Sequence, residues 1–275
     1  MQPNTAKITI IFSLSAIILL GGGCAFFKLQ PFSRAPRQLS SVPVTSSQPA
    51  NPTAVPGSEN IMNGIFDMIM EKKDIQKFID QQHGILSKYK EDSSDGLRTV
   101  AEELDQVTTL DLPTSLNPRV FLVLMELKSS IVTRPNVTDS EVRNVFGVTT
   151  QQYIDWLIKY INARRPSEKL SPGEITELKG QFSTTTLLMQ LEYVTDKFMG
   201  AIFEEQSSRK IIFKNGDSFQ PAANINSETY AIQAIMADLA DSQEQWELWV
   251  SKKPGSFYQT YKQWFGDPVL SEDLK

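Results

Sequence analysis

From residue 59 onward, apolar side chains recur mostly three or four positions apart, which is the spacing of one face of an α-helix. This pattern predicts a mainly α fold. The expected helices lie at 61–70 and 74–79 (as one helix or two), 97–107, 117–130, 140–146, 151–161, 172–182, 185–203, 227–240, 242–250 and 254–266. For the helix at 117–130, Asn117 is the expected N-cap, and Pro118 suits the first turn because it needs no amide hydrogen there.

The helical pattern is interrupted at 210–220, where Asn215-Gly216 separates two short apolar runs. Asn-Gly is typical of a two-residue hairpin loop, because both residues tolerate a positive φ. We therefore expect one small β-hairpin, in which a type I′ turn joins Ile211–Phe213 to Ser218–Gln220.

A different pattern precedes the helical region. Residues 8–27 carry no charge and are long enough to span a hydrocarbon core of about 30 Å, so 1–28 is expected to be a membrane anchor or signal segment. Cys24 follows three glycines, and it is the residue that would be lipidated if this segment is a lipoprotein signal. Residues 29–58 are rich in Pro, Ser and Thr and poor in large apolar residues, which indicates an extended linker. The layout predicts an extracytoplasmic helical domain at 59–275, tethered to the cell membrane.

Composition then narrows the chemistry. Four of the 27 basic residues and none of the 32 acidic residues precede residue 59, so the expected domain has a net charge of −9 and is a poor partner for nucleic acid. Cys24 and His83 are the only cysteine and the only histidine, which excludes an intrachain disulfide and strongly disfavours histidine triads and zinc sites. We expect no metal and no cofactor, and the oligomeric state stays open.

Glu126 stands out at the end of the most hydrophobic helix, directly after the apolar run Val120–Met125. A helix that is apolar on all sides belongs in the centre of a domain. Burial of a carboxyl group favours its protonated form, and a general acid acting on a glycosidic oxygen needs that form. The alternative is a surface glutamate where the helix emerges, paired with a lysine.

Four motifs occur in order along the chain: NPRVFLVLMELKS, NGD, NSETYAIQ and FGDP, within 117–268. Their order resembles a lysozyme-like group of bacterial surface proteins, distantly similar to soluble lytic transglycosylases and goose-type lysozymes. The resemblance implies a lysozyme-like helical domain that acts on cell-wall glycan. It also implies that Asn226 binds substrate, that Ser129 matches the serine after the catalytic glutamate, and that Gln151 lies with Gly147 in the Gly/Gln-containing second segment.

The chain departs from the family pattern at one decisive position. Ten residues after the Pro, where the family has its catalytic glutamate, this sequence has Lys128. Lysine is a poor proton donor at neutral pH. Either Glu126 has taken over the acid role or the site is degenerate, and the two side chains differ by about 200° around the helix. The hypotheses are therefore a glycosidase with Glu126 as its acid, a non-catalytic envelope binding or scaffolding module, and a helical domain with a protein partner.

For several other residues, a purely structural role is an alternative to a functional one. Asn226 could cap the helix that begins at Ser227 instead of binding a sugar. The C-terminal aromatic residues could line a glycan groove, but their helical spacing favours core packing; they are Trp246, Trp249, Tyr258, Tyr261, Trp264 and Phe265. Glu102-Glu103 is expected on a solvated helix face, and His83 is expected at the surface.

Overall fold

The computed structural model describes residues 56–64, 70–93, 96–109, 116–165 and 167–269. All of these residues belong to one compact unit, Val55–Lys275. The expected membrane segment with Cys24 and most of the expected linker lie outside the described residues. None of the helices that the structure describes is long and apolar enough to cross a membrane.

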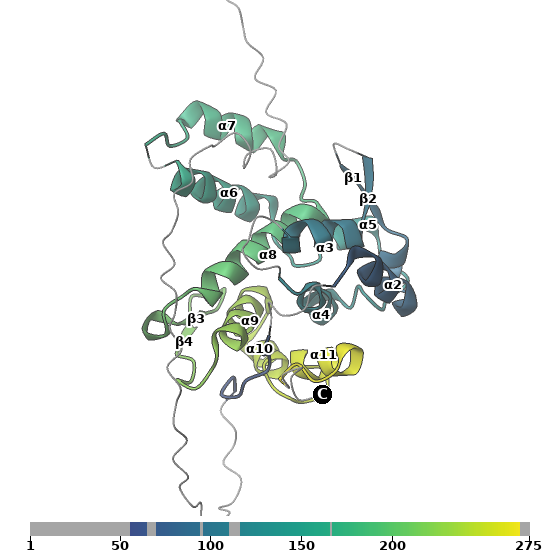
Figure 1. The fold of residues 1–275 in the computed structure, drawn as a ribbon. Helices are drawn as coiled ribbons and strands as arrows, with labels where there is room; N and C mark the ends of the chain where they lie inside the picture. Colours follow the sequence, from purple (N-terminus) through teal and green to yellow (C-terminus); the bar gives the residue numbers. More distant parts are fainter. Residues whose placement is uncertain (1–55, 65–69, 94–95, 110–115, 166, 270–275) are drawn as a thin grey trace, which may run out of the picture. The chain divides into compact units, whose positions relative to one another are not determined.

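The described unit is mainly helical, which confirms the prediction of a mainly α fold (Figure 1). Its α-helices are α2 (Lys72–Gln82), α3 (Val100–Thr109), α4 (Pro118–Ser129), α5 (Asp139–Arg143), α6 (Thr150–Arg164), α7 (Pro172–Gln181), α8 (Leu187–Ile202), α9 (Ser227–Leu239), α10 (Gln243–Trp249) and α11 (Phe257–Phe265). Two short 3-10 helices, Ile85–Ser87 and Gln206–Ser208, complete the set.

The core forms around α8 and α4. Helix α8 packs against α3 and α9, and α4 packs against α11 and α3 (Figure 1). In α4 every residue of Val120–Met125 is at most 1 % exposed, as expected for a helix that is apolar on all sides. Asn117 caps α4 by accepting a hydrogen bond from the Arg119 amide, and its Nδ2 donates to the Tyr261 hydroxyl at 3.0 Å. The cap therefore also ties α4 to α11.

The C-terminal aromatic residues mostly belong to this core. Trp246, Trp249, Tyr258 and Tyr261 are buried, whereas Trp264 and Phe265 are half-buried. The last two rings pack against Phe78 of α2, with centroid distances of 5.3 and 4.7 Å. Core packing, the favoured alternative in the sequence, accounts for the buried four.

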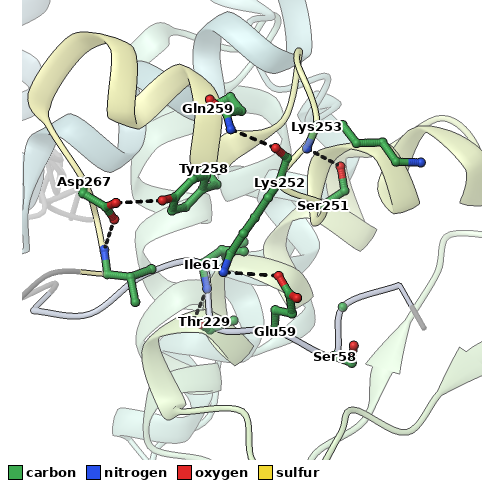
Figure 2. Close-up of polar contacts among 12 residues, drawn as sticks. Ser58, Glu59, Ile61, Thr229, Ser251, Lys252, Lys253, Tyr258, Gln259 and Asp267 are labelled. Carbon is green, nitrogen blue, oxygen red and sulfur yellow. Dashed lines mark hydrogen bonds and ion pairs between the residues drawn. The ribbon is translucent and has the colours of Figure 1, made fainter. Parts of the chain in front are cut away.

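The described unit begins with a segment outside the helices, 56–64, which contacts α9 and Lys252 after α10. We call this segment the strap. Ile61 and Met62 donate backbone hydrogen bonds to the Thr229 hydroxyl at 3.0 and 3.1 Å. Residues 61–64 therefore belong to the strap and do not start a helix. Figure 2 shows the same strap held at Glu59, whose carboxylate lies 3.2 Å from Lys252 Nζ. Gly57 is buried, and its carbonyl accepts a hydrogen bond from Gln233 at 3.0 Å. Residues 57 and 58, expected in the linker, already contact the helical unit because their polar groups have partners there.

The structure contains two hairpins where one was expected. Strands β3 (Ile211–Ile212) and β4 (Ser218–Phe219) form the predicted antiparallel pair. The second pair, β1 (Lys90–Ser93) with β2 (Gly96–Thr99), was not predicted because its strands are polar and lack alternating apolar residues. The Asp-Gly sequence at 95–96 is a hairpin signal that would have indicated it.

The turn of the predicted hairpin is not type I′. The Gly216 amide donates to the Phe213 carbonyl and the Phe213 amide to the Asp217 carbonyl, both at 2.9 Å, so the loop has three residues. Only Gly216 has a positive φ, +89°. Asn215 keeps a negative φ and its Oδ1 accepts from the Asp217 amide at 3.0 Å. This is the three-residue loop in which a type I turn is followed by one left-handed residue.

Substituting Gly216 by valine is expected to destabilise the protein by about 1 kcal/mol or more, because a β-branched residue is strained at this φ. Gly216→Asn is the matched control, since asparagine tolerates the left-handed region, and it should cost clearly less. Urea unfolding of both variants measures the difference. Equal stability of the two would contradict the assigned turn.

Candidate functional site

The end of α4 carries three of the predicted site residues. The helix stops at Ser130, which has a φ of +52° and whose amide donates to the Glu126 carbonyl at 2.7 Å. Glu126, Lys128 and Ser129 are all half-buried there. The position of this end is set by the buried turns before it, so each side chain leaves the helix in a defined direction.

Glu126 closes the loop that follows its own helix. Its carboxylate accepts hydrogen bonds from the Val132 amide at 3.1 Å, the Thr133 amide at 3.2 Å and the Thr133 hydroxyl at 2.6 Å. Both oxygens are therefore occupied by donors of 132–133. Glu126 therefore stabilises the turn in which the chain reverses direction after α4. Neither of its carboxylate oxygens is left without a hydrogen-bond donor, as an oxygen facing a substrate would be.

Lys128 leaves α4 in another direction and forms an ion pair. Its Nζ lies 2.7 Å from Asp241 Oδ1, and its side chain is only 13 % exposed. Lys214 of the β3–β4 loop approaches the same carboxylate oxygen at 3.7 Å. The hydrogen bond from Lys128, together with the charges of both lysines, lowers the pKa of Asp241 below its ordinary value. The position at which the resemblance places the catalytic acid thus holds a cation bound to a carboxylate.

The loop around Gly147 lies close to Lys128. A Cβ atom on Gly147 would lie 3.7 Å from Lys128 Cε, and Gly147 has a φ of +72°. Gln190 of α8 fixes the loop around it. The Gln190 Oε1 accepts from the Phe146 and Val148 amides at 3.2 and 3.1 Å, and its Nε2 donates to the Val148 carbonyl at 2.7 Å.

The remaining predicted residues make local contacts. Ser129 Oγ donates to the Met125 carbonyl at 2.9 Å, and the exposed Gln151 donates to Asp155 at 2.7 Å, one turn further along α6. Asn226 is the N-cap of α9: its Oδ1 accepts from the Thr229 amide at 2.7 Å and its Nδ2 donates to the Met62 carbonyl at 2.9 Å. The capping alternative for Asn226 is therefore observed.

The described contacts do not join Glu126 or Lys128 to Asn226. Asp241, the partner of Lys128, follows the C-terminal end of α9, while Asn226 caps the other end. Thirteen residues of helix separate the two ends, or about 20 Å at 1.5 Å per residue. Gly147, Lys214 and Asp241 lie around Lys128, whereas Asn226 at the N-terminus of α9 binds the Met62 carbonyl.

The structure also reveals a pair of buried carboxyl groups between α3 and α8. Glu103 is 2 % and Glu192 is 5 % exposed, so the prediction of a solvated face is wrong for Glu103. Tyr153 of α6 donates to Glu192 Oε2 at 2.8 Å. Burial raises the pKa of Glu192 to about 7, and the nearby charge of Glu103 acts in the same direction. A signal was present, because Glu103 shares a helix face with the apolar Val100 and Val107.

A third polar group supports the start of α8. Glu91 is buried and accepts from the Leu187 amide at 2.8 Å and from the Tyr89 hydroxyl at 3.0 Å, with Arg143 Nε 3.5 Å away. Burial raises the pKa of Glu91, while these donors counteract part of that shift. These contacts satisfy a helix N-terminus and indicate a structural role.

Among the residues that the structure describes, no group of three or more His, Cys, Asp or Glu side chains is arranged to hold a metal ion.

In comparisons with known proteins, the family model described as the LasA N-terminal domain matches residues 63–156, about a third of the chain. This range includes α2–α4 and ends within α6. No match was found among curated proteins or solved structures. Residues 63–156 are therefore similar to the LasA N-terminal domain.

Proposed function

We propose that the helical unit is a membrane-tethered, extracytoplasmic module that binds cell-wall glycan or organises envelope components without cleaving glycosidic bonds. The observation that carries this proposal is the state of the two candidate acids. Lys128, at the position where the resemblance places the acid, is paired with Asp241. The oxygens of Glu126 accept hydrogen bonds from 132–133. A general acid must reach the leaving oxygen with a transferable proton.

The lysozyme-like ancestry is part of the same proposal. It is supported by the order of the four motifs and by the proximity of Gly147 to Lys128, because the resemblance assigns these two residues to its second and first segments. The family-model match names LasA and not a lysozyme, and its description as an N-terminal domain favours a module that accompanies other parts of a protein. Binding to the wall and tethering at the membrane are compatible with that role.

The test is incubation of the full chain with purified sacculi. We expect the protein to sediment with the sacculi and to release no soluble muropeptide, because neither candidate acid is placed for proton transfer. Sacculus turbidity and chromatography of the supernatant measure cleavage, and sedimentation measures binding. Release of muropeptides by the wild type would overturn the non-catalytic role, and failure to sediment would overturn wall binding.

Glu126→Ala separates a structural from a catalytic role of this residue. Three donors lose their acceptor, so the free energy of unfolding should fall by about 1–3 kcal/mol, while sedimentation with sacculi stays unchanged. Ser129→Ala, which removes a hydrogen bond to the carbonyl one turn earlier, is the neighbouring control and should cost less. Loss of a muropeptide-releasing activity with unchanged stability would show instead that Glu126 is the acid.

A further inference from the structure

A depression away from the end of α4 lies where α2, β2 and α3 meet, three elements that are side by side in Figure 1. It has a volume of about 360 Å³ and is lined by Lys72, Leu97, Arg98, Glu102, Asp105 and Gln106. This volume is at the lower end of the range of small-ligand sites. None of the six residues was singled out as a ligand-binding residue in the sequence.

The charged side chains that line the depression differ in how many hydrogen bonds and ion pairs they form with the protein. Glu102 Oε2 accepts from the Thr99 amide at 2.8 Å and thereby supports the start of α3, which lowers the pKa of Glu102. Lys72 is loosely held, since its Nζ lies 3.6 Å from Glu102 Oε1 and its side chain is 53 % exposed. The Asp105 carboxylate forms no hydrogen bond or ion pair within the described part of the chain. One cation and one anion on this wall are thus available to a ligand.

The depression has two further features, an amide group without an acceptor and an exposed apolar side chain. Gln106 Oε1 accepts from Arg98, but its Nε2 is buried and has no acceptor among the described residues. A buried amide donor without an acceptor costs about 1–3 kcal/mol, so this side of the depression is less stable than its hydrogen-bonded surroundings. Leu97, at the rim, is 62 % exposed and offers apolar surface.

We propose that this depression binds a small apolar zwitterion, namely an apolar amino acid or a dipeptide. The ammonium group pairs with Asp105, the carboxylate pairs with Lys72, and the apolar side chain covers Leu97. The wall carries two cationic and two acidic residues, so a ligand with both charges fits it better than an ion of either sign. This inference does not depend on whether the unit binds glycan.

The test titrates the full chain with L-leucine and three analogues that lack one or both charges: leucinamide, N-acetyl-leucine and N-acetyl-leucinamide. Calorimetry or ligand-observed NMR gives the affinities. We expect saturable binding of leucine, and each loss of a charge should weaken binding roughly three- to tenfold. Leucyl-leucine in parallel distinguishes a free amino acid from a peptide as the preferred ligand.

Two variants locate the site through selective losses. Asp105→Asn should weaken leucine but not N-acetyl-leucine, and Lys72→Gln should weaken leucine but not leucinamide, because each analogue already lacks the charge that the variant no longer contacts. Lys73→Gln is the matched control, since Lys73 lies outside the lining residues and pairs with Glu71. The comparison within each variant stays valid if its stability changes. No saturable leucine binding, equal binding of all four compounds, or parallel losses for leucine and its analogues would overturn the proposal.

Discussion

Glu192→Gln is expected to raise the free energy of unfolding by about 3 kcal/mol at about pH 8 and to leave it nearly unchanged below about pH 4.5. In the folded protein the pKa of Glu192 is about 7, against an ordinary value of 4.5. Between these values the folded state holds a proton that the unfolded state has released. Wild-type stability therefore falls as the pH rises through this window and levels off above it. Glutamine mimics the protonated carboxyl group and can still accept from Tyr153.

Thermal or urea unfolding across this pH range measures the effect. Glu205→Gln is the matched control, because Glu205 is exposed; the pH profile of this variant should run parallel to that of the wild type. The nearby charge of Glu103 contributes to the raised pKa of Glu192, so Glu103→Gln should weaken the pH dependence as well. An unchanged pH slope in Glu192→Gln and in Glu103→Gln would contradict this account of the buried pair.

Gln190→Leu is expected to lower the free energy of unfolding by about 3 kcal/mol or more, because two buried amides and one carbonyl lose their partner at once. These groups belong to Phe146 and Val148, which flank Gly147. Leucine is similar in size, so the loss comes from unsatisfied hydrogen bonds and not from a cavity. Urea unfolding gives the stability, and hydrogen exchange at the two amides should accelerate.

The exposed Gln243→Leu on α10 is the control, since it removes only a solvent-accessible hydrogen bond to Glu247. It should change stability by less than about 0.5 kcal/mol. If Gln190→Leu were equally mild, the loop around Gly147 would be held by other contacts, and the environment of Lys128 would not depend on Gln190.

Short-range patterns were sufficient for most of the helices. The apolar spacing, the Asn117-Pro118 start and the continuous run to Met125 predicted α4 and its burial, because these signals act within one or two turns. They also predicted the β3–β4 hairpin, although the turn type depended on whether Asn215 or only Gly216 takes a positive φ. The polar β1–β2 hairpin was missed because short apolar runs on both sides of a turn were the signal used for strands.

The roles of the polar residues depended on contacts between distant parts of the chain. The sequence showed only that Glu126 and Lys128 leave α4 in different directions. Glu126 binds 132–133 because of the path of the chain after α4, and Lys128 binds Asp241 because of its path after α9. Asn226 was equally suited to a sugar or to a cap, and the strap at Met62 made it a cap. Glu103 lies on an apolar helix face, but only the packing of α8 in the core buries Glu192 and raises its pKa to about 7, with a further contribution from the charge of Glu103. Local sequence sets which backbone conformation is stable, but the charge state and availability of a side chain depend on what the tertiary fold places against it.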